Sequence, residues 1–252
     1  MTEPGDSLNG RVWGFWATAG FGLVISVVYF VTAIIVAVAF IVVRIISGST
    51  FSLSQLGETL GDNGLFLSLA TFATTIVCVG LITIIVKVRR GATIVEYLGF
   101  RRITRKTMFI FLAVSAGFII LSDCLSLILG KPLNSEFMVN TYNTSVWPPL
   151  FWVAVIIFAP AFEETFFRSF LFEGFRQSRI GLIGTIGLTA LIWAILHMQY
   201  DIYGIVTIFV TGILLGIVRF KTGSLWSPLL MHVFFNFVAT LQVAININSL
   251  VS

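Results

Sequence analysis

Six polar side chains with reactive or hydrogen-bonding groups lie inside long apolar segments of this 252-residue chain. These residues are Glu163, Glu164, Arg168, His197, His232 and Asn236. The chain has two histidines in total, and both belong to this set. Charged groups inside a membrane span are costly, and they are kept where they have a partner or a function. Acids and imidazoles in such a setting could together activate a water molecule for hydrolysis.

The spacing of the two glutamates and the arginine suggests that one glutamate supports the site and the other takes part in the chemistry. Glu164 and Arg168 are four residues apart, so a helix would bring them together as an ion pair. Glu163 lies about 100° around the helix from Glu164 and is not committed to that pair. We therefore expect Glu164 and Arg168 to support the site, and Glu163 to remain available as a general base.

The histidines and the asparagine supply the other groups that hydrolysis needs. The neutral imidazole of His197 can orient or deprotonate the water that Glu163 activates. Asn236 follows His232 by four residues, so the two share a helix face. Both can donate hydrogen bonds to a developing oxyanion. No serine or cysteine lies in a nucleophile motif such as G-x-S-x-G, so we predict attack by water rather than by a side chain.

A zinc site is the alternative interpretation of the same residues. Glu163, His197 and His232 could bind zinc and leave a fourth position open. The chain has no H-E-x-x-H helix signature, although ligands from three separate helices could still meet. We prefer direct activation of water by glutamate and histidine, with no cofactor, and keep zinc as the less favoured alternative.

Composition sets the kind of protein that must position these residues. Hydrophobic residues make up 58% of the chain and charged residues 10%, whereas soluble domains carry about 25% charged residues. Apolar runs of about 20 residues can cross a bilayer as helices. The sequence therefore predicts an all-α, polytopic transmembrane bundle. The net charge of +4 comes mainly from residues at helix ends, so we expect lipid and a membrane-associated peptide or protein as partners, and no nucleic acid.

About seven spans can be drawn, and basic residues between them predict the orientation. Lysine and arginine are concentrated in 87–106, which places that segment and the N-terminus in the cytoplasm of a multi-pass cell-membrane protein. The polar segment 134–149, with Trp147 near its end, reads as an external loop. We divide the chain into N-terminal helices with a basic loop (1–146) and a catalytic four-helix core (147–252). The predicted spans are 12–43, 65–86, 108–129, 150–172, 182–198, 202–218 and 225–245.

Three further features of the spans bear on the site. His197 lies about 15 residues into the fifth span, roughly 22 Å along a helix, so that span must tilt or unwind near its end for His197 to meet Glu163. Gly212 and Gly216 form a G-x-x-x-G spacing, which we interpret as ordinary close packing of helices. Asp123 is an intramembrane acid outside the motifs, and we expect it to make a packing or polar contact.

The motifs resemble those of the CAAX protease and bacteriocin-processing family (CPBP, also called Abi) of intramembrane peptidases, described as metalloproteases or glutamic-type endopeptidases. That family has E-E-x-x-x-R, F-x-x-x-H and H-x-x-x-N on successive helices. Residues 163–168 read E-E-T-F-F-R and residues 232–236 read H-V-F-F-N. The middle motif departs, because Trp193 stands where phenylalanine is usual. Leu98-Gly99-Phe100-Arg101 also resembles a stretch common in bacterial members.

The resemblance covers roughly 147–245 and implies roles for the motif residues. Glu163 would be the catalytic base together with His197, and His232 with Asn236 would form the oxyanion hole. The implied activity is an intramembrane endopeptidase, a hydrolase like the CAAX prenyl proteases. Two alternatives stay open: a non-catalytic immunity or scaffold protein of the same fold, and a proton-coupled carrier. No inverted repeat of the kind found in carriers is visible.

Overall fold

The chain folds into an all-α bundle in the computed structural model, which describes residues 8, 10–48, 57 and 60–251. The predicted fold class is confirmed, and no strand occurs in these ranges. One long helix, here called the central helix, is formed by consecutive segments over Pro148–Arg176. The other helices are α1 (Phe15–Ile46), α3 (Gly64–Val88), α4 (Ile94–Leu98), α5 (Arg105–Ile128), α6 (Glu136–Asn143), α10 (Gly181–Ile195), α11 (Ile202–Thr222) and α12 (Trp226–Val251).

Six helices are long and apolar enough to cross a membrane: α1, α3, α5, the central helix, α11 and α12. The remaining predicted span, the fifth (182–198), corresponds to α10, which is apolar but has only 15 residues. It ends at Ile195, and a turn follows before α11 begins at Ile202. The unwinding that His197 required is therefore present at the end of the fifth predicted span.

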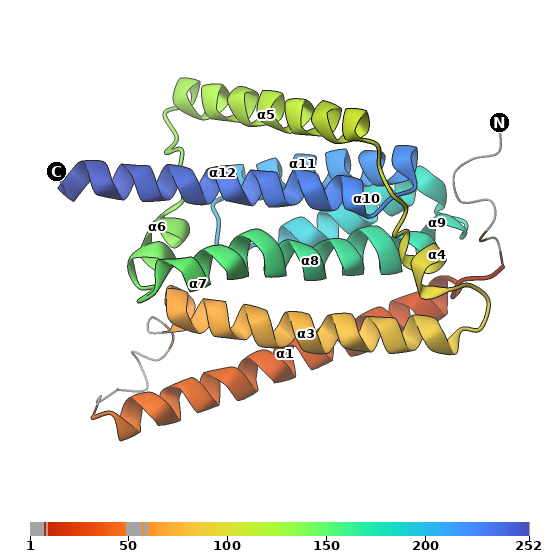
Figure 1. Ribbon diagram of the computed structural model, residues 1–252, viewed down its shortest axis with the longest axis horizontal. Coiled ribbons are helices and arrows are strands. Elements are labelled where there is room, and N and C mark those ends of the chain that lie inside the picture. The colour runs from red at the N-terminus through yellow and green to blue at the C-terminus, as the bar shows by residue number, and fades with distance from the viewer. Residues whose placement is uncertain (1–7, 9, 49–56, 58–59, 252) are drawn as a thin grey trace.

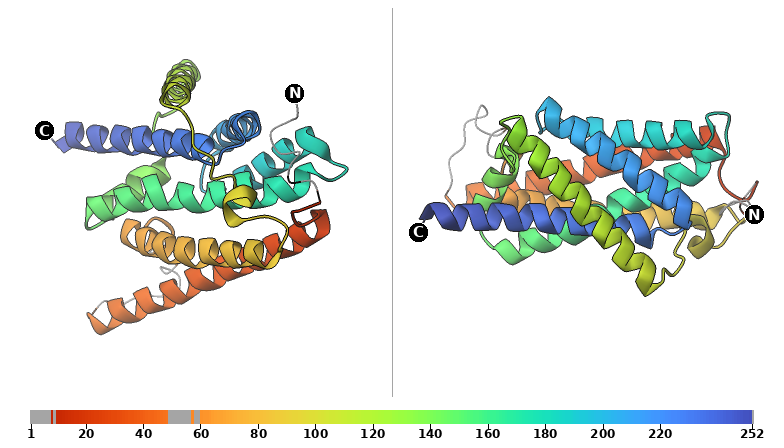
Figure 2. Two further views of the ribbon diagram at one scale, coloured as in Figure 1. Left: turned by 45° about the vertical axis from the view of Figure 1, so that its right-hand side comes forward. Right: turned by 90° about the horizontal axis from the view of Figure 1, so that it is seen from above.

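The helices lie in layers on either side of the central helix (Figure 1). Helices α1 and α3 pack together on one side of it, and α10, α11 and α12 lie on the other. Helix α5 is outermost and crosses α12 at an angle (Figure 2). The interior between these layers is where polar groups from distant parts of the chain can meet.

Side chains next to the helix ends explain several of the boundaries. Asn63 accepts a hydrogen bond from the Phe66 N–H at the start of α3, and Thr104 accepts one from Thr107 at the start of α5. Such caps satisfy amides that have no partner within the helix. Asp201 caps α11 in the same way. The Gly204 N–H, with help from Lys131, holds the pKa of the Asp201 carboxyl below its usual range.

Two close approaches between helices depend on glycine. A side chain at Gly212 would press on Ala190 and Trp193, so the predicted G-x-x-x-G packing brings α11 against α10. A Cβ at Gly64 would collide with the backbone of Thr141. Thr141 belongs to α6, a helix inside the segment 134–149 that we predicted to be a loop. The connection predicted as an external loop therefore contains a short helix that packs against the start of α3, which the sequence analysis did not specify.

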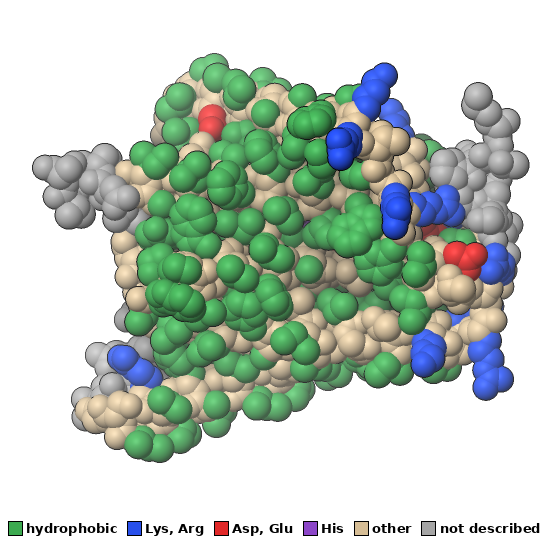
Figure 3. Space-filling view, in the orientation of Figure 1, with side chains coloured by type: hydrophobic (Ala, Val, Ile, Leu, Met, Phe, Trp, Pro, Cys, Tyr) green, Lys and Arg blue, Asp and Glu red, His purple; other side chains and the backbone are tan. Residues whose placement is uncertain are grey.

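The surface shows the charge pattern expected of a membrane protein. Large hydrophobic side chains cover the flank of the bundle in Figure 3. Lysine and arginine gather at one end, beside α4 and the start of α1 (Figures 1 and 3). The chain is thus a multi-pass membrane protein.

Candidate active site

The central helix places two adjacent glutamates in different surroundings. Glu164 and Arg168 form the ion pair expected from their spacing, with 3.3 Å between Oε1 and Nη1, and both side chains are 0% exposed. Glu163 is 19% exposed. The guanidinium of Arg168 also lies over the ring of Trp193, 4.3 Å from its centroid, where the π face attracts a cation. Glu164 is thus neutralised within the bundle, while Glu163 remains accessible.

His232 connects the two glutamates from α12. Its Nδ1 lies 2.8 Å from Glu164 Oε1, and its Nε2 lies 3.9 Å from Glu163 Oε2. An ionised carboxylate only accepts hydrogen bonds, so Nδ1 is the donor to Glu164. In the neutral imidazole, Nε2 is then an acceptor directed towards Glu163. Donation from this nitrogen to an oxyanion requires the imidazolium form.

Trp193 contacts Glu163 directly, which the sequence analysis did not anticipate. Its indole Nε1–H donates a hydrogen bond to Glu163 Oε2. The ring also lies between the two histidines, with centroid distances of 5.2 Å to His197 and 5.3 Å to His232. The departure from phenylalanine at this position was the signal: tryptophan adds an N–H donor to the aromatic wall.

His197 lies beside this cluster, and it contacts residues close to it in sequence. Its Nδ1 is 2.8 Å from the Trp193 carbonyl oxygen, and its ring lies 6.2 Å from that of Tyr200. Because a carbonyl only accepts, Nδ1 carries the proton and Nε2 is left for substrate or water. In the part of the chain that the structure describes, Trp193 and His232 are the recorded polar contacts of Glu163.

Asn236 lies one turn beyond His232 and braces the central helix. Two stretches of that helix are π-helical: η2 (Ala154–Phe158) and η3 (Glu164–Leu171). They alternate with α7 (Pro148–Val153), α8 (Ala159–Glu163) and α9 (Phe172–Arg176). Asn236 Nδ2 donates to the Val155 carbonyl at 2.8 Å. One amide N–H of Asn236 is therefore used within the fold, and the second is available to a ligand.

Two more side chains bond to carbonyls of the π-helical stretches. Thr75 Oγ1 donates to Phe158 at 3.0 Å, and Arg219 Nε donates to Arg168 at 2.8 Å. Hydrogen bonds in a π turn run i→i+5, so carbonyls near a change of helix type become free for other donors. These contacts hold the central helix on both sides of Glu163 and Glu164, where it changes from α to π. The sequence did not predict the π-helical stretches.

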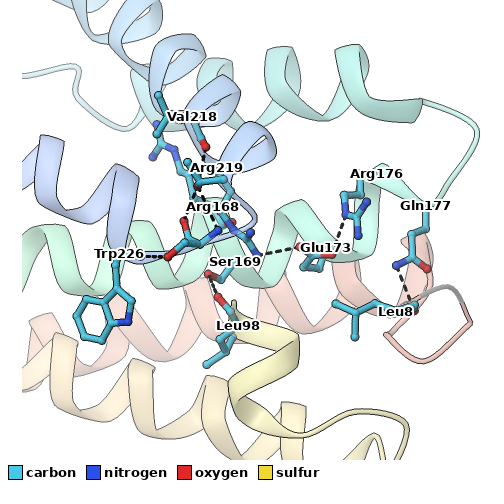
Figure 4. A network of polar contacts seen from close by, with 12 residues as sticks. Leu8, Leu98, Arg168, Ser169, Glu173, Arg176, Gln177, Val218, Arg219 and Trp226 are labelled. Atoms are coloured by element: carbon cyan, nitrogen blue, oxygen red, sulfur yellow. Dashed lines mark hydrogen bonds and ion pairs between the residues drawn. The ribbon is translucent and has the colours of Figure 1, made fainter. Parts of the chain in front are cut away.

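A buried charge cluster anchors the basic end of the central helix (Figure 4). Arg219 on α11 donates to Glu173 at 2.8 Å, and Arg176 donates to the other oxygen of that carboxylate at 2.7 Å. Gly99, whose φ is +75°, leaves room for Arg219. The Gly99 carbonyl oxygen accepts a hydrogen bond from the Leu225 N–H at 2.8 Å. The stretch Leu98–Arg101 that resembles bacterial family members is thus a structural contact between α4 and the α11–α12 turn.

One cavity of about 1280 Å³ joins the accessible members of the site. It is lined by Glu163, Trp193, His197, His232 and Asn236, whereas Glu164 and Arg168 lie behind its wall. The structure therefore brings all six predicted residues into one region. Four of them line the cavity together with Trp193, and the other two form the buried Glu164–Arg168 pair behind it.

The arrangement of the possible ligands bears on the zinc alternative. Within the described ranges, no group of three His, Cys, Asp or Glu side chains is arranged to hold an ion. Glu164 and the Trp193 carbonyl hold Nδ1 of the two histidines, so only Nε2 of each ring could bind an ion, and these atoms are not grouped with Glu163 around an ion in the described residues. A catalytic zinc usually takes three protein ligands. The alternative ligand set Glu163, His197 and His232 is therefore not assembled, and we derive no step through a metal.

Fold and site together define a polytopic helical membrane protein with a glutamate–histidine centre inside its bundle. Residues 145–238 match a family model described as type II CAAX prenyl endopeptidase Rce1-like. The chain therefore carries an Rce1-like domain, and the resemblance indicated by the motifs is confirmed. The matched segment includes all six motif residues, and its description points to a protease. No curated protein and no solved structure matches the chain significantly.

Proposed function

We propose that the protein is an intramembrane endopeptidase that hydrolyses peptide bonds of a membrane-associated protein or peptide. One observation carries the proposal: of two adjacent intramembrane glutamates, Glu164 is paired with Arg168 and His232, while Glu163 faces a cavity that also exposes both histidines. An accessible carboxylate beside an imidazole is the arrangement that activates water. The Rce1-like description of residues 145–238 supports the same class of reaction.

Glu163 acts as the general base in this proposal. The 3.9 Å between Glu163 Oε2 and His232 Nε2 is too long for a direct hydrogen bond and suits a bridging water. Glu163 takes a proton from that water as the water oxygen attacks the peptide carbonyl carbon. The carbonyl π electrons move to oxygen, and the tetrahedral intermediate forms. When the C–N bond breaks, the proton on Glu163 passes to the leaving amine.

The remaining groups orient the reactants and stabilise the oxyanion. The second amide N–H of Asn236 donates to the developing negative charge, and His232 joins it when its imidazole is protonated. His197, fixed by the Trp193 carbonyl, offers Nε2 to the water or to a substrate N–H. Glu164 and Arg168 hold His232 in place. This division of roles requires no metal cofactor.

The setting of the reaction is part of the proposal. We propose that the protein resides in the cell membrane with its basic end and N-terminus in the cytoplasm, because lysine and arginine favour that side. The substrate is expected to be membrane-associated because the cavity is enclosed by membrane-spanning helices.

A Glu163→Gln variant tests the function. The amide is nearly isosteric with the carboxylate but cannot act as a base, so proteolysis should be abolished while yield and melting temperature stay close to wild type. Peptides from membranes and culture medium are compared between cells with wild-type protein and cells with the variant. Products that disappear identify substrates. Purified Glu163→Gln protein with full activity on such a substrate would remove Glu163 from the mechanism.

A further inference from the structure

The inner face of helix α5 combines polar residues with apolar ones such as Phe118, while its outer face is apolar. Its two buried residues are serines, Ser115 and Ser126, while large apolar side chains along it are exposed on the flank. Ser126 forms a hydrogen bond with the Tyr203 hydroxyl at 2.9 Å. Serines are common where membrane helices pack closely, so Asp123 is the residue of this face that packing alone does not explain. The part of this face from Phe118 to Ser126 lines the cavity that contains Glu163.

Asp123 is the acid on this polar wall. It accepts a hydrogen bond from Gln242 Nε2 at 2.8 Å, and both residues line the cavity. Over the described residues, no ion pair involves Asp123, whereas Glu164 and Glu173 in the central helix are paired with arginines. The neutral amide of Gln242 supplies a hydrogen bond and no charge. An intramembrane carboxylate without a cation calls for a partner from outside the fold.

The position of Asp123 relative to the site follows from α12. Gln242, the hydrogen-bond partner of Asp123, comes ten residues after His232, which corresponds to about 15 Å along α12. An extended peptide covers roughly 3.3–3.6 Å per residue. A substrate that lies along the cavity wall therefore reaches from the Glu163–His232 pair to Asp123 in about four residues.

We propose that Asp123 is a subsite that binds a cationic side chain of the substrate, about four residues from the bond that is cleaved. This inference rests on the proposed function for the position of the cleaved bond. The binding of the cation itself does not depend on catalysis. A lysine or arginine in an otherwise apolar segment would exchange its hydration for the Asp123 carboxylate, with Ser122 and Ser126 nearby on the same wall.

Binding is tested with two probe peptides that differ in one charge. Both are apolar, blocked at their termini and carry a photo-crosslinker, and one has lysine where the other has norleucine. Apparent affinities are measured by crosslinking to Glu163→Gln protein in nanodiscs. This substitution removes a carboxylate that could also bind the lysine, and it prevents cleavage of the peptide during the measurement. The lysine peptide should bind about tenfold more tightly, the lower end of what close charge pairs contribute across interfaces. The Asp123→Asn variant should abolish that preference.

Asp62→Asn is the matched control. Asp62 also accepts a hydrogen bond from a side-chain amide, that of Asn140 at 3.1 Å, but it does not line the cavity. This variant should keep the preference for lysine. Equal binding of the two peptides, no binding of either, or a preference that survives Asp123→Asn would each overturn the inference.

Cleavage gives the second readout and separates the two proposals. A single lysine is moved along the peptide, and wild-type protein should shift its cut site with it, at a constant separation. Cut sites that ignore the lysine would overturn the spacing. A lysine preference in binding together with no cleavage by wild-type protein would instead contradict the proposed function and leave Asp123 as a cation-binding residue.

Discussion

Trp193 donates its indole N–H to the carboxylate of Glu163, so the residue that departs from the family motif is in direct contact with the proposed base. The same ring carries the guanidinium of Arg168 on its face. One side chain thus connects the accessible glutamate with the buried ion pair behind it. A phenylalanine could fill this space but could not donate the hydrogen bond.

Trp193→Phe should lower activity about tenfold without abolishing it, because a hydrogen bond to a charged group is worth about 1.5–3 kcal/mol. Glu163 would keep its place against an aromatic wall but lose a fixed orientation. Rates on a substrate identified by the peptide comparison give the measurement. Trp226→Phe is the control, since Trp226 contacts Phe100 at the basic end, away from the cavity. Equal rates for Trp193→Phe and wild type would show that the contact has no part in the reaction.

Glu164→Ala and Arg168→Ala should each reduce yield and thermal stability as well as activity. Removal of one partner leaves the other charge buried, which costs about 3–5 kcal/mol. Glu164→Ala also releases His232 Nδ1. Melting temperatures in detergent are compared with those of Lys131→Ala, which breaks the half-exposed Lys131–Asp201 pair and should change little. If all three variants melt like wild type, the Glu164–Arg168 pair is not buried as described.

The orientation in the membrane can be decided by two introduced cysteines at opposite ends of α5. Arg102 and Pro132 are both exposed, one before the helix and the other after it. In intact cells, a membrane-impermeant maleimide should label Pro132→Cys and should leave Arg102→Cys unlabelled until the membrane is permeabilised. The reverse pattern would invert the topology and the side that the basic loops face.

Metal dependence is the fourth prediction. If Glu163 and His232 hold the water, activity should survive exhaustive chelation, and active protein should lack stoichiometric zinc. The reason is geometric: within the described residues no three His, Cys, Asp or Glu side chains are grouped around an ion, and the 3.9 Å between Glu163 and His232 suits a bridging water. Elemental analysis is performed on the same preparation as the activity assay. Stoichiometric zinc, with activity lost on chelation and restored by added metal, would make Glu163, His197 and His232 ligands.

Much of the architecture followed from the sequence because it depends on local properties of the chain. Apolar runs predict spanning helices wherever they are long enough, and the six long helices agree with this. The Glu164–Arg168 pair was predictable because residues four apart meet on one helix. That the motif residues share one region was also expected, since polar groups in lipid must find partners within the protein.

Tertiary structure decided which of these groups meet. The polar contacts of Glu163 are with Trp193 and His232. His197 lies in the turn after α10 and lines the same cavity, with Nδ1 on the Trp193 carbonyl. The π-helical stretches depend on donors from α3, α11 and α12, which no local pattern reveals. The direction of Asp123 likewise depends on how α5 crosses α12. Spacing along one helix is set by the chain itself, whereas contacts between helices are set by where each helix ends and how it packs.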